Sequence, residues 1–379
     1  MRGASLFQLS VLVLCAGMLA CGSGGGTGGA KGTTGGDGSQ TGSPVYVTNN
    51  TVGSVSVYQL NQTSGALQRT TGSPVTTGGS SPDSMATDPS KKFLLVANSS
   101  SSSISVFTVN SSTASLSPVS GSPFSTPANS VRMVVHPNGN FVYVLGSTPG
   151  QILGYSFNST TGALTLLTGF PVSLNSSGAM GLAISTNGSF LYASNPNTNV
   201  ITSFSIGTTG ALTLITTTTP RQGSPTYLTF DSSGNFLFGV NAGGSLGASS
   251  VSTFAVSLTG TLTEVTSSPV PVGTNPVSAV FSQGALYVVN QTSNTLSAFG
   301  LNSSTGQLTE LKGSPYTVGA RPVSAAAAVL GRFLIVTSSA SSNVGSILVF
   351  AIAADGTLTQ VTGSPFTPDA AVPDQVLAL

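Results

Sequence analysis

Few side chains in this sequence can carry out acid–base or nucleophilic chemistry. Its 379 residues include 9 Asp+Glu, 10 Lys+Arg, one His and two Cys. Cys15 and Cys21 both lie near the N-terminus, so the rest of the chain has no disulfide and no thiolate metal site. His136 lies in the sequence HPNG, which is typical of a turn. We therefore expect neither a Ser–His–Asp, Cys–His or zinc site nor a cofactor.

The acidic residues that stand out are Asp83 and Asp374, because each follows a proline in two related sequences, PDSMAT and PDQVLA. Two carboxylates brought close together can share a proton or hold a cation. Arg132 and Arg321 are the guanidinium groups that could join them, and two arginines can grip a carboxylate or a phosphate. These four residues are far apart in the sequence, so their chemistry depends on a fold that brings them together.

A repeated element can do this. Stretches similar to TTGALTLLTGFPV (160–172) occur seven times, at intervals of 46–50 residues. A fixed period of this size is typical of solenoids, arrays and propellers. The Gly suits the positive φ of a hairpin turn, and the Leu is expected to point into the packing between repeats. In one copy Ala114 replaces the Gly, which predicts a looser turn.

Each repeat has the pattern of four short strands. Within 275–316 these are NPVSAVF, ALYVVN, TLSAFGL and QLTELKGSP. The second strand occurs seven times, beginning with VYVTN at 45–49, but only six copies are preceded by a first strand. The missing first strand is PDQVLA at 373–378. We therefore predict an all-β fold over residues 44–379: a seven-bladed β-propeller of four-stranded antiparallel blades, closed by the C-terminal strand pairing into the N-terminal blade.

The sequence YVTN at 46–49, its variants and the TG-x-L-T turns resemble the YVTN/lactonase family of seven-bladed propellers, which includes the 6-phosphogluconolactonase-like proteins. The resemblance covers residues 44–379. It implies the propeller fold and, as an activity, the hydrolysis of a sugar lactone by charged and imidazole groups near the funnel. No His or Glu of this chain is expected there, so the residues themselves leave the activity open.

In a propeller the first strands begin around the central funnel. Two residues past the position that proline holds in most first strands, the residue is polar in six of seven cases: Ser84, Arg132, Leu182, Tyr227, Ser278, Ser324 and Gln375. One position earlier, Asp83 and Asp374 lie on neighbouring blades, and Arg321 precedes the proline of the blade before them. The candidate catalytic residues are Asp83 and Asp374. The candidate ligand-binding residues are Arg132, Arg321, Tyr227, Gln375 and Ser84. The same charges could instead form salt bridges that stiffen the closing seam.

The N-terminal 43 residues are expected to lie outside the propeller. Residues 1–20 have the short positive start and apolar stretch of an export signal. They end in MLA before Cys21, which resembles a bacterial lipobox. We expect a lipid on Cys21 to anchor the protein in the cell envelope, on the periplasmic face or the cell surface. Residues 21–43 comprise this Cys and a Gly/Ser/Thr-rich flexible linker.

The charge composition excludes some partners. With a net charge of +1 and 5% charged residues, the chain has no field to attract nucleic acid. The expected partners of this monomer are the membrane, through Cys21, and a small anionic ligand or a protein on the funnel face. A binding or interaction module is the favoured interpretation. The alternatives are a lactonase (a carboxylic ester hydrolase), in which Asp83 or Asp374 activates water and Arg132 or Arg321 holds the acid, and a structural envelope or adhesion component.

Overall fold

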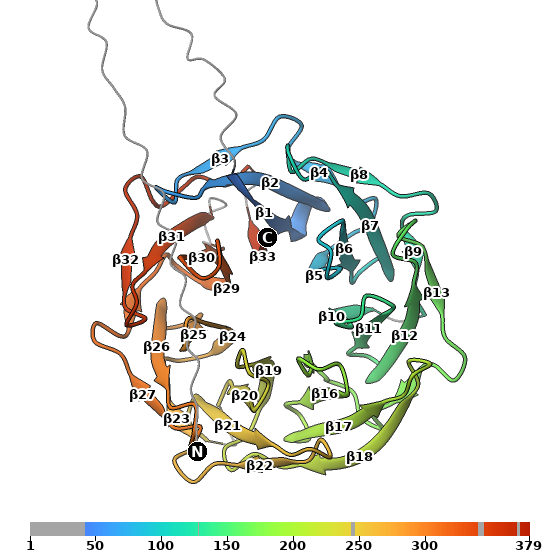
Figure 1. The fold of residues 1–379 in the computed structure, drawn as a ribbon, viewed down its shortest axis with the longest axis vertical. Helices are drawn as coiled ribbons and strands as arrows, with labels where there is room; N and C mark the ends of the chain where they lie inside the picture. The colour runs from blue at the N-terminus through green and yellow to red at the C-terminus, as the bar shows by residue number, and fades with distance from the viewer. Residues whose placement is uncertain (1–41, 128, 244–246, 340–344, 370–371) are drawn as a thin grey trace, which may run out of the picture. The chain divides into compact units, whose positions relative to one another are not determined.

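The computed structural model describes residues 42–127, 129–243, 247–339, 345–369 and 372–379. They form seven antiparallel sheets arranged as blades around a common axis (Figure 1). The expected export signal, Cys21 and the linker up to residue 41 lie outside the described residues. Within the described ranges no helix is long and apolar enough to cross a membrane.

We number the blades from the one that contains the N-terminal strand. In each blade the innermost strand and the second strand lie closer to the axis than the others. The innermost strands of blades 1–7 are β33 (Pro373–Ala378), β5 (Pro82–Thr87), β10 (Ser130–Val135), β15 (Gly181–Ile184), β19 (Pro225–Phe230), β24 (Pro276–Ser282) and β29 (Pro322–Ala328). The second strands are β1 (Gly42–Asn49), β6 (Phe93–Asn98), β11 (Phe141–Gly146), β16 (Phe190–Asn195), β20 (Phe236–Asn241), β25 (Ala285–Asn290) and β30 (Phe333–Ser338).

The outer strands complete each blade. The third strands are β2 (Ser54–Asn61), β7 (Ser103–Val109), β12 (Gln151–Phe157), β17 (Val200–Ile206), β21 (Ser250–Val256), β26 (Thr295–Leu301) and β31 (Ser346–Ile352). The fourth strands are β3 (Leu67–Arg69), β8 (Leu116–Pro118), β13 (Leu164–Leu166), β18 (Leu212–Thr218), β22 (Leu262–Glu264), β27 (Leu308–Glu310) and β32 (Leu358–Gln360). In five blades a two-residue strand also pairs with the third strand: β4 (Val75–Thr76), β9 (Phe124–Ser125), β14 (Val172–Ser173), β23 (Val270–Pro271) and β28 (Tyr316–Thr317).

The ring closes where the C-terminal strand joins the first blade. β33 pairs antiparallel with β1, with Val47 opposite Val376. Farther from the axis, Arg69 Nε lies 2.9 Å from a carboxylate oxygen of Asp369, the one ion pair within 4.0 Å among the described residues. The predicted seven-bladed fold and its closure are therefore confirmed. Pairing with β33 covers the inner edge of β1 and so closes the ring.

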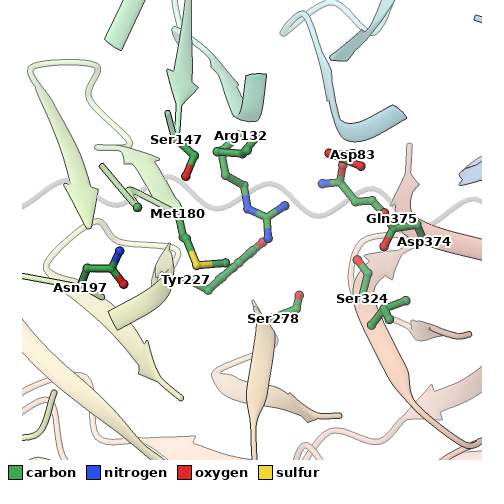
Figure 2. Close-up of a pocket in the computed structure, with 13 residues that line it drawn as sticks. Asp83, Arg132, Ser147, Met180, Asn197, Tyr227, Ser278, Ser324, Asp374 and Gln375 are labelled. Atoms are coloured by element: carbon green, nitrogen blue, oxygen red, sulfur yellow. The ribbon is translucent and has the colours of Figure 1, made fainter. Parts of the chain in front are cut away.

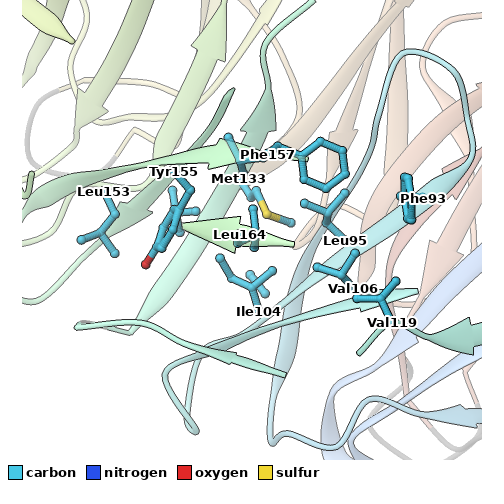
Figure 3. Close-up of a cluster of buried hydrophobic side chains, with 13 residues drawn as sticks. Phe93, Leu95, Ile104, Val106, Val119, Met133, Leu153, Tyr155, Phe157 and Leu164 are labelled. Carbon is cyan, nitrogen blue, oxygen red and sulfur yellow. The ribbon is translucent and has the colours of Figure 1, made fainter. Parts of the chain in front are cut away.

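Apolar side chains fill the space between neighbouring blades. Each of the seven interfaces holds one buried cluster. In the cluster of Figure 3, Leu95 and Ile104 of blade 2 pack with Met133, Leu153 and Leu164 of blade 3. Leu164 is the Leu of the repeated turn and is 8% exposed, which confirms that this leucine packs between repeats.

The repeated turn also joins each blade to the one before it. In four places a second-strand tyrosine hydroxyl donates a hydrogen bond of 2.8–3.0 Å to a turn carbonyl of the next blade: Tyr46 to Ala114, Tyr143 to Gly210, Tyr192 to Gly260 and Tyr287 to Gly356. At Gly260 φ is +80°, and a Cβ would lie 2.4 Å from the Phe190 ring. Glycine is therefore required by both backbone and packing, which explains why the chain repeats it.

The turn at Ala114 is not looser than the others, although its sequence predicts this. Ala114 has φ +61° and is fully buried, and its amide donates to the Asn110 carbonyl at 2.8 Å. Blade 1 has Pro44 at the position where most second strands have a phenylalanine. Because that aromatic ring is missing, a methyl group fits where glycine is needed elsewhere.

Candidate functional site

A cavity of about 430 Å³ opens at the end of the propeller where the innermost strands begin (Figure 2). Six innermost strands, the segment before β15 and two loops between second and third strands form its lining, so all seven blades contribute. The lining residues are Asp83, Val131, Arg132, Ser147, Gly178, Met180, Asn197, Tyr227, Ser278, Val323, Ser324, Asp374 and Gln375.

Bulges turn the side chains of the innermost strands into this cavity. The register of β5 against β6 shifts between Pro82 and Ser84, which places Asp83 at a bulge. The same kind of shift occurs in the pairing of β10, β19, β24, β29 and β33 with their second strands. A bulge redirects a side chain, and bulges are frequent beside functional sites. Pro82 suits the start of such a strand because it donates no ladder hydrogen bond.

Asp83 and Asp374 face the cavity from neighbouring blades (Figure 2). Burial is the main cause that raises the pKa of Asp374 to about 6, and the negative charge of Asp83 raises it further. Burial also raises the pKa of Asp83. Asn50, in the 3-10 turn η1 (Asn50–Val52), donates a hydrogen bond to Asp83 and favours its ionised form. A carboxyl group that titrates near neutral pH can accept a proton from water.

Arg132 supplies the positive charge of the cavity. Its guanidinium carbon lies 5.2 Å from the centre of the Tyr227 ring. Among the described residues no carboxylate oxygen lies within 4.0 Å of its nitrogens, and its Nε is buried without a hydrogen-bond partner. Its charge lowers the pKa of both Asp83 and Asp374 from a longer distance. Stacking thus holds the cation without using its terminal donors, which stay available to an anionic ligand.

Other members of the predicted polar ring join the innermost strands to one another. The Oγ of Ser84 accepts the amide of Met133 at 3.1 Å, and the Oγ of Ser324 accepts that of Val376 at 3.3 Å. The Oε1 of Gln375 accepts a backbone amide of β5. Ser84 is 1% exposed and does not line the cavity, so the structure gives it a role between blades. Ser324 and Gln375 both join strands and line the cavity.

The structure does not bring Arg321 to the cavity. This residue precedes β29, is exposed and has φ +51°, and its backbone amide donates to Asn294 Oδ1 at 2.8 Å. It is not part of the cavity lining. The arc of two arginines and two aspartates expected from the sequence is therefore reduced to Arg132 and the two carboxyl groups.

The ring position expected in blade 4 is wrong by one residue. Leu182 is 6% exposed and belongs to an apolar cluster. The register of β15 places Gly181, not Leu182, opposite Ser194, which is the position that Ser84 holds in blade 2. Met180, one residue earlier, lines the cavity. Blades 3 and 4 both lack a proline at the start of the first strand; in blade 3 the count still gives Arg132, but in blade 4 it begins one residue too late.

Four residues of this site are not singled out by sequence patterns: Ser147, Asn197, Met180 and Asn50. Ser147 and Asn197 lie in loops between second and third strands, and Asn50 lies in the equivalent place of blade 1. The sequence feature that could have identified them is their position, because the loops between second and third strands lie on the funnel face of a propeller. Their residue types are also common in turns, so composition alone does not distinguish them.

His136 lies at the opposite end of the strands, in the turn between β10 and β11, as expected. Its Nδ1 accepts the Asn138 amide at 3.1 Å, so the proton is on Nε2, which donates to the Gly188 carbonyl at 2.9 Å. The ring therefore links two turns of neighbouring blades. In the part of the chain that the structure describes, no group of three or more His, Cys, Asp or Glu side chains could hold a metal ion.

Comparisons with solved structures agree with this architecture. A candidate 6-phosphogluconolactonase from Bacteroides fragilis is 19% identical, with a TM-score of 0.74 over 90% of this chain and 99% of that one. A similar protein from Bacteroides uniformis is 17% identical, with a TM-score of 0.74 over 90% and 100%. The periplasmic gluconolactonase of Pseudomonas aeruginosa is 17% identical, with a TM-score of 0.72 over 89% and 99%. At these identities the likeness shows the fold alone. A search of curated protein sequences gave no significant match.

The sequence itself matches one family over nearly the whole propeller. The matched residues are 37–132, 132–245 and 242–370, and the family is described as lactonase, seven-bladed beta-propeller. The seven blades, the closure by β33 and the funnel-face cavity are consistent with this match. The chain therefore belongs to the lactonase family of seven-bladed β-propellers.

Proposed function

We propose that the central cavity binds a small lactone and hydrolyses it to a hydroxy acid. One observation carries the proposal: two carboxyl groups with raised pKa values share an open cavity with an arginine that, among the described residues, has no carboxylate oxygen within 4.0 Å of its nitrogens. A site that served only to bind an anion would be weakened by two carboxylates beside it. A carboxyl group that titrates near neutral pH, as Asp374 does with a pKa of about 6, is instead suited to proton transfer.

In the proposed reaction Asp374 transfers the proton and Arg132 stabilises the negative charge. The ionised carboxylate of Asp374, whose pKa is about 6, takes a proton from a water molecule as the oxygen of that water attacks the lactone carbonyl carbon. The carbonyl oxygen gains the negative charge, and Arg132 stabilises it. The carbon–oxygen bond of the ring then breaks, and the proton on Asp374 passes to the leaving oxygen. The product is a hydroxy acid, whose new carboxyl group releases its proton to solvent and lies beside Arg132 as a carboxylate.

Asp83 tunes this proton transfer. Its charge raises the pKa of Asp374, so the base is stronger than an isolated aspartate would be. Asn50 donates a hydrogen bond to Asp83 and favours its ionised form. In this account Asp83 stays charged while Asp374 gains and loses the proton.

Hydrolysis by purified residues 42–379 tests the proposal, with δ-gluconolactone and its phosphorylated form as first substrates. Asp374→Asn should abolish turnover, whereas Asp355→Asn is a matched control because Asp355 is an exposed aspartate in an outer turn away from the cavity. Equal turnover in wild type and Asp374→Asn would overturn the proposed chemistry.

A second candidate function is a binding module without catalysis. It is favoured by the lining of the cavity, which among the described residues includes no His and no Glu. Binding of a hydroxy acid that depends on Arg132, with no turnover of any lactone, would support this function. A structural envelope or adhesion role would instead be supported by a partner that contacts the loops and ignores substitutions in the cavity.

We further propose that a lipid on Cys21 anchors the protein in the cell envelope as a monomer. The lipobox-like sequence motivates this proposal. The strand β1 starts at Gly42 and ends at Asn49, whose partner Pro373 is next to Asp374. Gly42 is thus at the end of β1 away from the cavity. Incorporation of labelled palmitate that is lost in Cys21→Ser would support the anchor, and label retained in Cys21→Ser would contradict it.

A further inference from the structure

The cavity has an apolar side as well as a charged side. At the bulge position of blade 2 the side chain is Asp83, and Asp374 is its counterpart in blade 1. In blade 4 the equivalent position, one residue before Gly181, holds Met180. Figure 2 shows Met180 and the two carboxyl groups on opposite sides of the cavity. Equivalent positions of the repeat therefore carry opposite chemistry.

Met180 is more exposed than the methionines of two innermost strands. Its side chain is 44% exposed and directed into the cavity, whereas Met85 and Met133 on neighbouring innermost strands are 3% and 5% exposed. A single exposed apolar residue on a convex surface needs no explanation, and Leu258 is an example. In a concave site the same exposure offers contact area to a ligand.

The size of the cavity fits a ligand with more than a bare ring. Its volume of about 430 Å³ lies within the range of roughly 300–1,000 Å³ that is typical of sites for drug-sized molecules. A lactone carbonyl placed between Asp374 and Arg132 leaves the side near Met180 to be filled by the rest of the molecule. Water left against a thioether would be less favourable than an apolar group there.

The geometry points to a lactone that carries an alkyl or aryl substituent, with Met180 as the residue that selects it. This inference rests on the proposed lactone hydrolysis and names its substrate class. The ring ester meets the charged side of the cavity, and the substituent packs against Met180 on the apolar side. The bonds made and broken are those of the ester hydrolysis described above, so no further reactant is needed.

Two lactones that differ only in an alkyl chain test the inference. We expect kcat/KM of residues 42–379 to be at least about tenfold higher for δ-decalactone than for δ-valerolactone. Met180→Gln, which keeps the length of the side chain but makes it polar, should lower this ratio about tenfold. Met180→Leu should keep the ratio within about a factor of two, because Leu and Met are close in volume.

A control variant distinguishes an effect of the cavity from an effect of the surface around it. Val52 is 58% exposed in η1 and does not line the cavity, so Val52→Gln should not change the ratio. A wild type that prefers δ-valerolactone, or a ratio that Met180→Gln leaves unchanged, would overturn the inference while lactone hydrolysis itself stands.

If no lactone is turned over, the proposed hydrolysis is wrong, and ligand binding then tests the apolar contact with Met180. The probes are the two product acids, 5-hydroxydecanoate and 5-hydroxypentanoate, measured by calorimetry. Tighter binding of the longer acid that Met180→Gln removes supports the apolar contact. Equal binding of the two acids, or a difference that persists in Met180→Gln, overturns it.

Discussion

The two ends of the innermost strands place aspartates in very different surroundings. At the turn end, Asp231 accepts hydrogen bonds from the amides of Ser233 and Phe236 at 3.1 and 2.8 Å, and also from the Ser233 hydroxyl. At the cavity end, Asp83 and Asp374 face open space; the side chains of Ser99 and Asn50 act on Asp83, and Asn50 also acts on Asp374. The residue type is the same at both ends, but backbone amides act on the carboxylate at the turn end and side chains act on it at the cavity end.

In this repeat fold, aspartates that stabilise turns and aspartates suited to proton transfer lie at opposite ends of the strands. Asp231 is 4% exposed, and backbone donors fixed by its own turn satisfy its carboxylate. Such a group stabilises the turn, and three of its roughly four acceptor sites are already used. The cavity carboxyl groups lack this set of donors, so burial raises their pKa values and keeps them available for proton transfer. The turn aspartates should therefore affect stability, and the cavity aspartates should affect activity.

The largest expected effect is the loss of hydrolysis in Asp374→Asn. The amide cannot take the proton of the attacking water, so kcat should fall by about 10²–10⁴-fold. The measurement is release of acid from the lactone at pH 7. Asp231→Asn is the matched control at the turn end, and the comparison fails if both variants lose activity to the same extent.

Removal of the positive charge should have the next largest effect. Arg132→Met keeps an apolar stem over Tyr227 but cannot stabilise the developing oxyanion, so kcat should fall by about 10²-fold. A fall that appears only as a higher KM would mean that Arg132 binds the substrate and does not act in the transition state. Steady-state kinetics with the best lactone measures both quantities.

At the turn end we expect a loss of stability without a loss of activity. Asp231→Ala leaves two backbone amides without their acceptor, which should lower the free energy of unfolding by about 1–3 kcal/mol. Denaturant unfolding measures this value, and turnover per folded molecule should stay at the wild-type level. Reduced turnover in fully folded Asp231→Ala would contradict the separation of roles.

The smallest expected effect is a pH dependence of stability caused by Asp374. Its pKa is raised from 3.8 to about 6, so the folded state binds more protons than the unfolded state between these pH values. Stability should therefore fall as pH rises from about 4 to about 6, by about 1–2 kcal/mol. The slope should be weaker in Asp374→Asn, as measured by urea unfolding at a series of pH values. A slope that is unchanged in this variant would show that other groups cause it.

Most of the fold can be predicted from the sequence because the strand and turn pattern of one blade recurs seven times. The turn glycines, the buried leucines and the second strands each recur, and the lone first-strand sequence PDQVLA predicts the closure. The register of the innermost strands is harder to predict. It depends on bulges: a proline marks the start of β5, whose pairing has a bulge, but β10 has a bulge without a proline and the pairing of β15 has no register shift.

The site is predicted in part for the same reason. Asp83, Asp374, Arg132, Tyr227 and Gln375 follow from counting along the repeat, and all of them line the cavity. The position of an exposed side chain such as Arg321 depends on its own backbone, here at φ +51°, and the count cannot give this. Met180 is missed because a methionine near the start of a strand is more often part of the core.

The pH dependence of kcat/KM for lactone hydrolysis tests the central claim most directly, because it reports the titration of the free enzyme. The account predicts a rising limb with an apparent pKa of about 6 in the wild type, and its loss in Asp374→Asn together with the activity. The same limb should persist in Asp231→Asn. A rate that stays constant from pH 5 to pH 8, or a limb that survives in Asp374→Asn, would contradict the assignment of this cavity as a proton-transfer site.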